Sequence, residues 1–403
     1  MRRLLLTGAA LALAGLVLTP AVAATPRPDL MKMLQVFGES LDIAERYHID
    51  EIDAVAAARA GLVGMMESLD QQSRYIAPSE FGSLSGGAEP AASAGLYLGS
   101  EDGLIIVNTA PDGGPAAQAG IRVGDFLTAI DGRTMVGAPY AVASQALRGE
   151  PGKLVAVSVL RPDGSRFDAR LALTAPLPQS VTARLEGDYG YIRAPNLNDT
   201  ATGQIRDAIG SLRQARPGLK GLVLDLRNNP GGLLDQVVGV ADLFLDGGEV
   251  LSQRGRNPRD VERYNARPGD SLGGLPLVVL IDGGTASGAE CIAAALQDHK
   301  RARIVGTTSF GTGMVQTVIP LSGGKDGTLK LTTGRLTRPN GEMIDGAGVT
   351  PDVRVARSKA DAERPLRRYQ TSPPTAPESP PAGFDPAGDY PLVRAFALLK
   401  SAG

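Results

Sequence analysis

Ser287 is the residue of this sequence whose surroundings best suit a nucleophile. Residues 280–300, LIDGGTASGAECIAAALQDHK, have the pattern of a strand end, a Gly-Gly turn and a helix start. At a helix start the macrodipole would favour a serine alkoxide, and the Gly288 N–H could help to bind an oxyanion. Ser and Thr are also common N-caps, so Thr285 or Ser287 has a purely structural interpretation as well. The spacing leaves catalysis and capping both open.

A second glycine-rich loop, RNNPGG at residues 227–232, also follows an apolar strand pattern and precedes a helix pattern. The N–H groups of Gly231 and Gly232 would be exposed at a helix N-terminus, which suits an oxyanion site. A plain strand-to-helix turn is the alternative. In α/β sheets, loops that leave the ends of parallel strands form the crevice in which ligands bind.

A serine nucleophile requires a base, and histidine is poorly placed to be one. His48 lies in an early helical segment, and His299 ends the helix that Ser287 begins. Twelve helical residues span about 18 Å, so His299 cannot reach Ser287 along that helix. A lysine whose pKa is lowered by burial is the remaining base. Two histidines and the single Cys291, expected to be buried, make no zinc site, and no cofactor is predicted.

Composition excludes several classes of protein. The 403 residues are enough for two or three domains, and 43% hydrophobic with 21% charged residues is ordinary for a globular protein. A net charge of −2 without a long basic stretch predicts no nucleic-acid partner.

The first residues have the pattern of a secretory signal peptide. Arg2 and Arg3 precede an apolar run and the small residues Ala21-Val22-Ala23, so residues 1–23 are predicted to be removed. This predicts a periplasmic or secreted protein without an integral membrane span after cleavage. An uncleaved membrane anchor is the alternative.

Periodicity divides the remaining chain into segments. Residues 24–80 are predicted to be helical, and 82–95 form a Gly/Ser/Ala-rich linker. Residues 93–175 are predicted to form a small β-rich module with two helices. Strands and helices alternate over 176–356, which indicates a sheet covered on its faces. A Pro-rich linker over 357–388 and a helix within 389–403 complete the chain, so the fold class is α/β (α+β).

These segments carry the motifs of a known family. LDLRNNPGG, DGGTASGAE and LKLTTGRLTRPNG, in this order, resemble the carboxyl-terminal processing (tail-specific) serine peptidases. SLDQQSRY resembles another family motif, and the 93–175 module is similar to a PDZ domain. The resemblance covers roughly residues 30–356 and implies a β/α-sandwich peptidase core with an inserted PDZ domain and N-terminal helices.

The resemblance also implies the site, with one departure. The family uses a Ser-Lys dyad, often helped by Gln, and the corresponding positions are Ser287, Thr312 and Gln316. Thr312 stands where the family has its lysine. A threonine hydroxyl is no general base near neutral pH, and loss of such a base typically costs ~10²–10⁴-fold in rate. Lys300, Lys325 and Lys330 are not convincing replacements.

Three hypotheses follow: an active endopeptidase, a catalytically impaired pseudoprotease that acts as a peptide-binding scaffold or regulator, and a pure PDZ-type interaction protein. The retained Ser287, Gln316 and RNNPGG disfavour the third, and Thr312 disfavours the first.

The resemblance further implies that protein or peptide C-termini bind in the PDZ groove. Gly95, Leu96, Tyr97 and Leu98 correspond to the loop that receives a C-terminal carboxylate. Leu96 to Leu98, with Ala146 and Leu147, predict an apolar pocket, although core packing explains each side chain equally well. The terminal helices either form a homodimer, as in relatives, or pack on their own domain.

Overall fold

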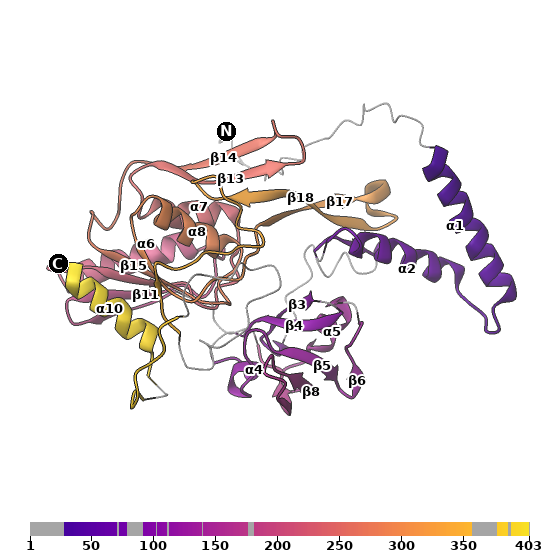
Figure 1. The fold of residues 1–403 in the computed structure, drawn as a ribbon, viewed down its shortest axis with the longest axis horizontal. Coiled ribbons are helices and arrows are strands. Elements are labelled where there is room, and N and C mark those ends of the chain that lie inside the picture. Colours follow the sequence, from indigo (N-terminus) through magenta and orange to yellow (C-terminus); the bar gives the residue numbers. More distant parts are fainter. Residues whose placement is uncertain are drawn as a thin grey trace, which may run out of the picture. The chain divides into compact units, whose positions relative to one another are not determined.

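The computed structural model describes residues 28–70, 72–78, 92–101, 103–110, 113–138, 140–175, 181–356, 377–385 and 388–402 (Figure 1). The chain divides into two compact units, residues 1–64 and 65–403. The predicted signal peptide lies outside the described residues. Helices α1 (Pro28–Tyr47) and α2 (Ala54–Glu67) occupy the segment in which helical periodicity was expected. Among the described helices, none combines the length and the apolar character that crossing a bilayer requires.

The centre of the second unit is a largely parallel sheet. Its strand order is β10-β11-β12-β15-β16-β19, and only the β10–β11 pair is antiparallel. The bounds are β10 (Thr182–Glu186), β11 (Tyr189–Arg193), β12 (Leu222–Asp225), β15 (Leu277–Ile281), β16 (Arg303–Gly306) and β19 (Val353–Arg354). Every residue of β12 and β15 is buried, as their unbroken apolar runs predicted.

Helices cover both faces of this sheet. Leu222 and Leu224 point into a core shared with α6 (Ala201–Ala215), α7 (Leu234–Asp242) and α8 (Gly288–Asp298). Val223 points to the opposite face, where α10 (Tyr390–Ala402) packs (Figure 1). Successive strand residues face opposite sides, so one apolar strand supplies both cores. The mixed helix and strand class is therefore confirmed.

A second, antiparallel sheet was not predicted. Its order is β1-β18-β13-β14, and β17 also pairs with β18. The bounds are β1 (Arg74–Ile76), β13 (Gly248–Gly255), β14 (Val261–Ala266), β17 (Met314–Pro320), the short 3-10 turn η1 (Leu321–Gly324) and β18 (Thr328–Thr337). Much of β14 and β17 is exposed, so these strands lack the apolar run that identified β12.

The predicted β-rich module folds around its own core. Its main sheet has the order β3-β4-β5-β8-β9, with β6 on β5, while β2 pairs with β7. An Asp-Gly turn joins β5 and β6, with positive φ at Asp131 (46°) and Gly132 (76°). The second of its two helices ends at Ala146, because Arg148 and Gly149 pair with β2.

The bounds of the module's elements are β2 (Ala92–Ser93), β3 (Tyr97–Glu101), β4 (Leu104–Thr109), α4 (Pro115–Gln118), β5 (Phe126–Ile130), β6 (Arg133–Thr134), α5 (Tyr140–Ala146), β7 (Arg148–Gly149), β8 (Leu154–Leu160) and β9 (Arg166–Ala172).

Candidate active site

Three loops meet at the carboxyl edge of the parallel sheet. They follow β12, β15 and β16, which are neighbours in the sheet. The first is the glycine loop (residues 226–232), the second is the serine loop (282–287), and the third is the 307–313 loop. Parallel strands bring their following loops to one edge, which is where α/β sheets bind ligands.

Ser287 occupies a strained backbone conformation at the start of α8. Its φ of 51° and ψ of −119° lie outside the regions that a side chain favours. Such strain costs roughly 1–3 kcal/mol and is typical of functional positions, including the serine turns of α/β-hydrolases. Ser287 is also the N-cap of α8, and its N–H donates to Glu290 in the manner of a capping box, but an ordinary N-cap adopts extended backbone and does not require this strain.

The glycine loop packs directly against the serine loop. A Cβ atom added at Gly231 would lie 2.8 Å from Gly288 N and 3.1 Å from Ser287 Cβ, so a larger residue would collide with the helix start. Gly231 also has a φ of 92°, which favours glycine. Its N–H donates to Asn229 Oδ1 over 2.8 Å, so this N–H could serve an oxyanion only after that bond opens.

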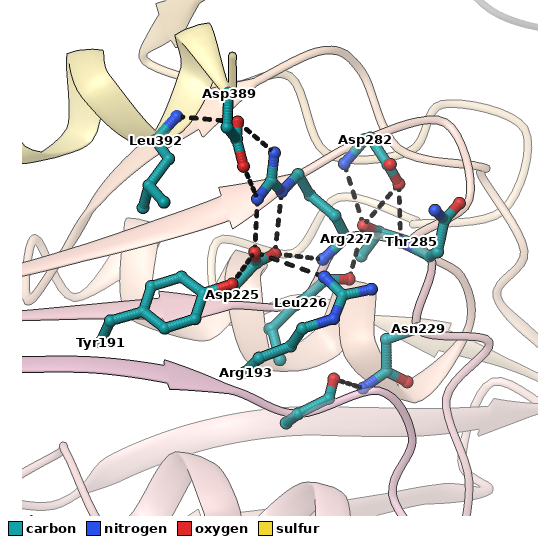
Figure 2. Close-up of polar contacts among 12 residues, drawn as sticks. Tyr191, Arg193, Asp225, Leu226, Arg227, Asn229, Asp282, Thr285, Asp389 and Leu392 are labelled. Carbon is teal, nitrogen blue, oxygen red and sulfur yellow. Dashed lines mark hydrogen bonds and ion pairs between the residues drawn. The ribbon is translucent and has the colours of Figure 1, made fainter. Parts of the chain in front are cut away.

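Hydrogen bonds fasten these two loops together (Figure 2). Asn228 N donates to Asp282 Oδ1 over 2.9 Å, and Thr285 Oγ1 donates to Leu226 O over 2.9 Å. Ala286 N donates to Asn229 O over 2.8 Å. The Thr285 hydroxyl therefore links the two loops and does not act as the N-cap of α8.

Glu290, for which no role was predicted, ties the third loop to the serine loop. This carboxylate is fully buried on the first turn of α8. Its Oε2 accepts from Ser287 N (2.8 Å) and Thr312 N (2.9 Å), and its Oε1 accepts from Ser309 Oγ (2.5 Å) and Gly311 N (2.7 Å). Burial outweighs these four donors and raises the pKa of Glu290 to about 7. An acidic residue three positions after a helix-initial serine is the signal that could have identified it.

The shared Oε2 atom places position 312 beside the serine. Two backbone nitrogens within hydrogen-bonding distance of one oxygen must be close neighbours, so the backbone of Thr312, the residue expected at the position of the family lysine, lies beside that of Ser287. The side chain there is a threonine hydroxyl. His299, by contrast, ends α8 at the opposite end from Ser287, and its Nε2 lies 2.7 Å from Glu249 O.

The other lysines considered lie on other elements. Lys300 follows α8 with a positive φ of 55°, and Lys325 follows η1. Lys330 lies in β18 opposite Arg74 of β1. Burial, with a smaller effect of Arg74, lowers the pKa of Lys330.

Gln316, at the start of β17, donates through Nε2 to Thr332 Oγ1 over 2.8 Å. Its Oε1 is buried without a hydrogen-bond partner among the described residues. Cys291 is buried as predicted, and burial raises the pKa of its thiol, so it is no competing nucleophile.

Comparisons with known proteins identify the family of this chain. Residues 188–355 match peptidase family S41, and residues 106–161 match a PDZ domain. A carboxy-terminal-processing protease of Bartonella bacilliformis is 34% identical over 96% of this chain and 92% of its own length. The chain belongs to this family of S41 proteases.

Other relatives support the assignment. A probable CtpA-like serine protease of Staphylococcus aureus is 31% identical over 76% of this chain, and the match spans 62% of that protein's length. The structure of a photosystem II D1 C-terminal processing protease superposes with a TM-score of 0.68 at 28% identity. It covers 79% of this chain and 92% of its own.

In this family member, a buried arginine anchors the glycine loop to the C-terminal helix (Figure 2). Arg227 Nε donates to Asp225 Oδ1 (2.9 Å), and its two terminal nitrogens donate to Asp389 (2.8 and 2.7 Å), which immediately precedes α10. Burial alone would raise the pKa of Asp225, but Arg227 and Arg193 hold it at about 2.

The PDZ domain offers an open strand edge. In the described part of its sheet, β3 is terminal and pairs only with β4, and α5 contacts β3. The predicted pocket residues divide into two groups. Leu98 and Leu147 belong to the domain core, whereas Leu96 and Ala146 are half-buried against it and Tyr97 is 41% exposed. Core packing therefore accounts for Leu98 and Leu147.

Proposed function

We propose that this S41 protease binds the C-terminal tails of proteins through its PDZ domain and has a peptidase site that is complete except for its general base. The observation that carries the proposal is the shared Glu290 oxygen, which holds Thr312 beside Ser287. Ser287 would act as nucleophile, and the N–H groups of Gly288, Gly232 and, after its bond opens, Gly231 would face the oxyanion. Without the base we expect a rate loss of ~10²–10⁴-fold.

The deciding experiment compares three purified proteins: native, Ser287→Ala and Thr312→Lys. Each is incubated with an unfolded substrate that has an apolar C-terminus, and cleavage is followed by mass spectrometry. We expect the native protein to be nearly inert and Thr312→Lys to cleave. Cleavage by the native protein that Ser287→Ala abolishes would overturn the missing-base proposal.

An active endopeptidase with a displaced base is the second candidate. Lys330 favours it, because this lysine is half-buried with a lowered pKa and lies two residues before Thr332, the partner of Gln316. If the native protein cleaves, Lys330→Met should abolish cleavage. Activity that survives Lys330→Met would exclude Lys330 as the base.

Tail binding is proposed from the edge position of β3. An extended peptide would add as a strand to β3 beside α5, with its carboxylate at Gly95–Leu98 and its last side chain near Leu96 and Ala146. Fluorescence anisotropy with a peptide ending in an apolar residue tests this. We expect binding that the same peptide with an amidated C-terminus does not show.

We further propose export through the N-terminal signal peptide to the periplasm or the exterior, and self-association through α1. Positions 30, 33, 34 and 37 of α1 are apolar at helical spacing, and no residue of α1 is buried. N-terminal sequencing of the exported protein tests cleavage after residue 23.

A further inference from the structure

The segment before β1 begins a chain of hydrogen bonds between polar groups that has no role in the reaction proposed above. Asp70 accepts at Oδ1 from Gln72 N (2.8 Å) and Ser73 N (2.7 Å), and at Oδ2 from Ser73 Oγ (2.7 Å). Burial alone would raise the pKa of Asp70, but these donors together hold it below its ordinary value. Asp70 is therefore a carboxylate at neutral pH.

The chain continues through Ser73 into β18. Ser73 is almost fully buried, and its Oγ accepts from Thr332 N over 3.1 Å while donating to Asp70. Thr332 Oγ1 in turn accepts from Gln316 Nε2 over 2.8 Å. Thr332 takes part through two different groups: its Oγ1 accepts from Gln316, whereas its backbone N–H donates to Ser73. Ser73 Oγ also lies 3.4 Å from Thr332 Oγ1. The network therefore links Gln316 to Asp70 through Thr332 and Ser73.

This chain determines how the Gln316 amide is oriented. Its nitrogen is committed to Thr332, so its oxygen must face elsewhere, and that oxygen is buried without a partner among the described residues. Native proteins leave few buried acceptors unpaired, and a functional role is one accepted explanation for those that remain.

We infer that Asp70, Ser73 and Thr332 are positioning residues that hold Gln316 with its Oε1 directed as an acceptor toward a protonated base at position 312. This inference rests on the proposed function of the Ser287 site. An acceptor for the ammonium would raise the pKa of a lysine at 312 and restrict the position of its nitrogen. The SLDQQS motif thus becomes part of the peptidase site although it lies more than 200 residues before Ser287 in sequence.

The kinetic test uses the Thr312→Lys protein as its background. Adding Ser73→Ala or Thr332→Val should lower kcat by roughly 10-fold to 100-fold with little change in KM, because positioning is lost. It should also move the acidic limb of the pH–rate profile to lower pH. Thr332→Ser keeps the hydroxyl and should restore both values.

Tyr75→Phe is the matched control. Tyr75 lies in β1, two residues after Ser73, and its hydroxyl donates to Asp326 O over 2.8 Å, outside the polar network. It should leave kcat and the pH profile unchanged. Equal effects of Ser73→Ala and Tyr75→Phe, with an unmoved profile, would show that the chain only fastens β1 to β18 and would overturn the inference.

A readout without catalysis separates this inference from the proposed function. In the native chain labelled with ¹⁵N-glutamine, Ser73→Ala should shift the Gln316 side-chain resonances and accelerate exchange of its Nε2 protons, and Tyr75→Phe should not. If Thr312→Lys cleaves nothing, the proposed function fails, and the NMR comparison still decides the inference. Unchanged Gln316 resonances in Ser73→Ala would refute the chain directly.

Discussion

At the scale of single residues, two positions at the start of α8 have energetically unfavourable features. Ser287 has a positive φ, and the carboxyl group of Glu290, three residues later, is fully buried. Neither feature stabilises a fold by itself, so both are expected where a reacting group must be held in place. Each gives a measurable prediction.

Ser287→Gly should be more stable than Ser287→Ala by about 1 kcal/mol, because glycine relieves the positive φ that alanine retains. Both variants lack the hydroxyl, so the comparison isolates backbone strain. Urea denaturation at neutral pH gives the two unfolding free energies. Equal values would mean that residue 287 is unstrained.

Glu290 should make stability depend on pH in the opposite sense to an ordinary carboxylate. Its pKa is raised from 4.5 to about 7 by burial, so between these values the folded state binds more protons than the unfolded state. The free energy of unfolding should therefore fall as pH rises through this window, by about 3 kcal/mol. Urea denaturation between pH 5 and pH 8 measures this slope.

Glu290→Gln cannot titrate, so its unfolding free energy should vary less across the same range even if the variant is less stable overall. Asp225 acts in a separate window. Its pKa in the folded state is about 2, below the ordinary value. Ionised Asp225 therefore stabilises the folded state at pH values above that ordinary pKa, and this stabilisation is lost as the pH falls toward 2. Parallel pH curves for the native protein and Glu290→Gln would contradict the assignment to Glu290.

At the scale of elements, the glycine loop depends on a helix that comes at the end of the sequence. Asp389 precedes α10, accepts from Leu392 N, and binds both terminal nitrogens of Arg227 (Figure 2). The Arg227 side chain is only 10% exposed, so its charge depends on these carboxylates rather than on water.

Asp389→Asn should therefore destabilise the protein by about 1–3 kcal/mol, because it removes one of the two carboxylates around a buried guanidinium. The matched control is Glu186→Gln, which breaks the exposed pair with Arg184 and should change stability by less than about 1 kcal/mol. Thermal or urea unfolding distinguishes the two. A change at Asp389 as small as that at Glu186 would show that α10 does not anchor Arg227.

At the scale of the whole molecule, α1 presents more apolar surface than a solvated helix needs. Leu30, Met33, Leu34 and Phe37 are each 47–62% exposed, which suggests a contact with a second copy of the chain. Leu34→Asp should then shift the sedimentation equilibrium of the protein toward the monomer. Gln35→Asp, on the other side of α1, should leave it unchanged, and a monomeric native protein would refute the proposal.

The sequence by itself determined the family, the helix and strand class and the central parallel strands, and it proposed Ser287, Thr312 and Gln316 as the site positions. Those features depend on local periodicity and short motifs, which can be recognised directly in the order of the residues. The antiparallel sheet was missed because strands such as β14 are half exposed and lack an apolar run.

Only the tertiary structure decided which polar groups meet. Glu290 joins residues 287 and 312, Asp389 reaches Arg227 across 162 positions, and Ser73 reaches Thr332 across 259. The tertiary structure also pairs the Thr285 hydroxyl with Leu226 O, and it pairs the Gly231 N–H with Asn229 of the same loop. Hydrogen bonds between distant segments leave no periodic trace in a sequence, because they depend on how the sheet brings its strand ends together.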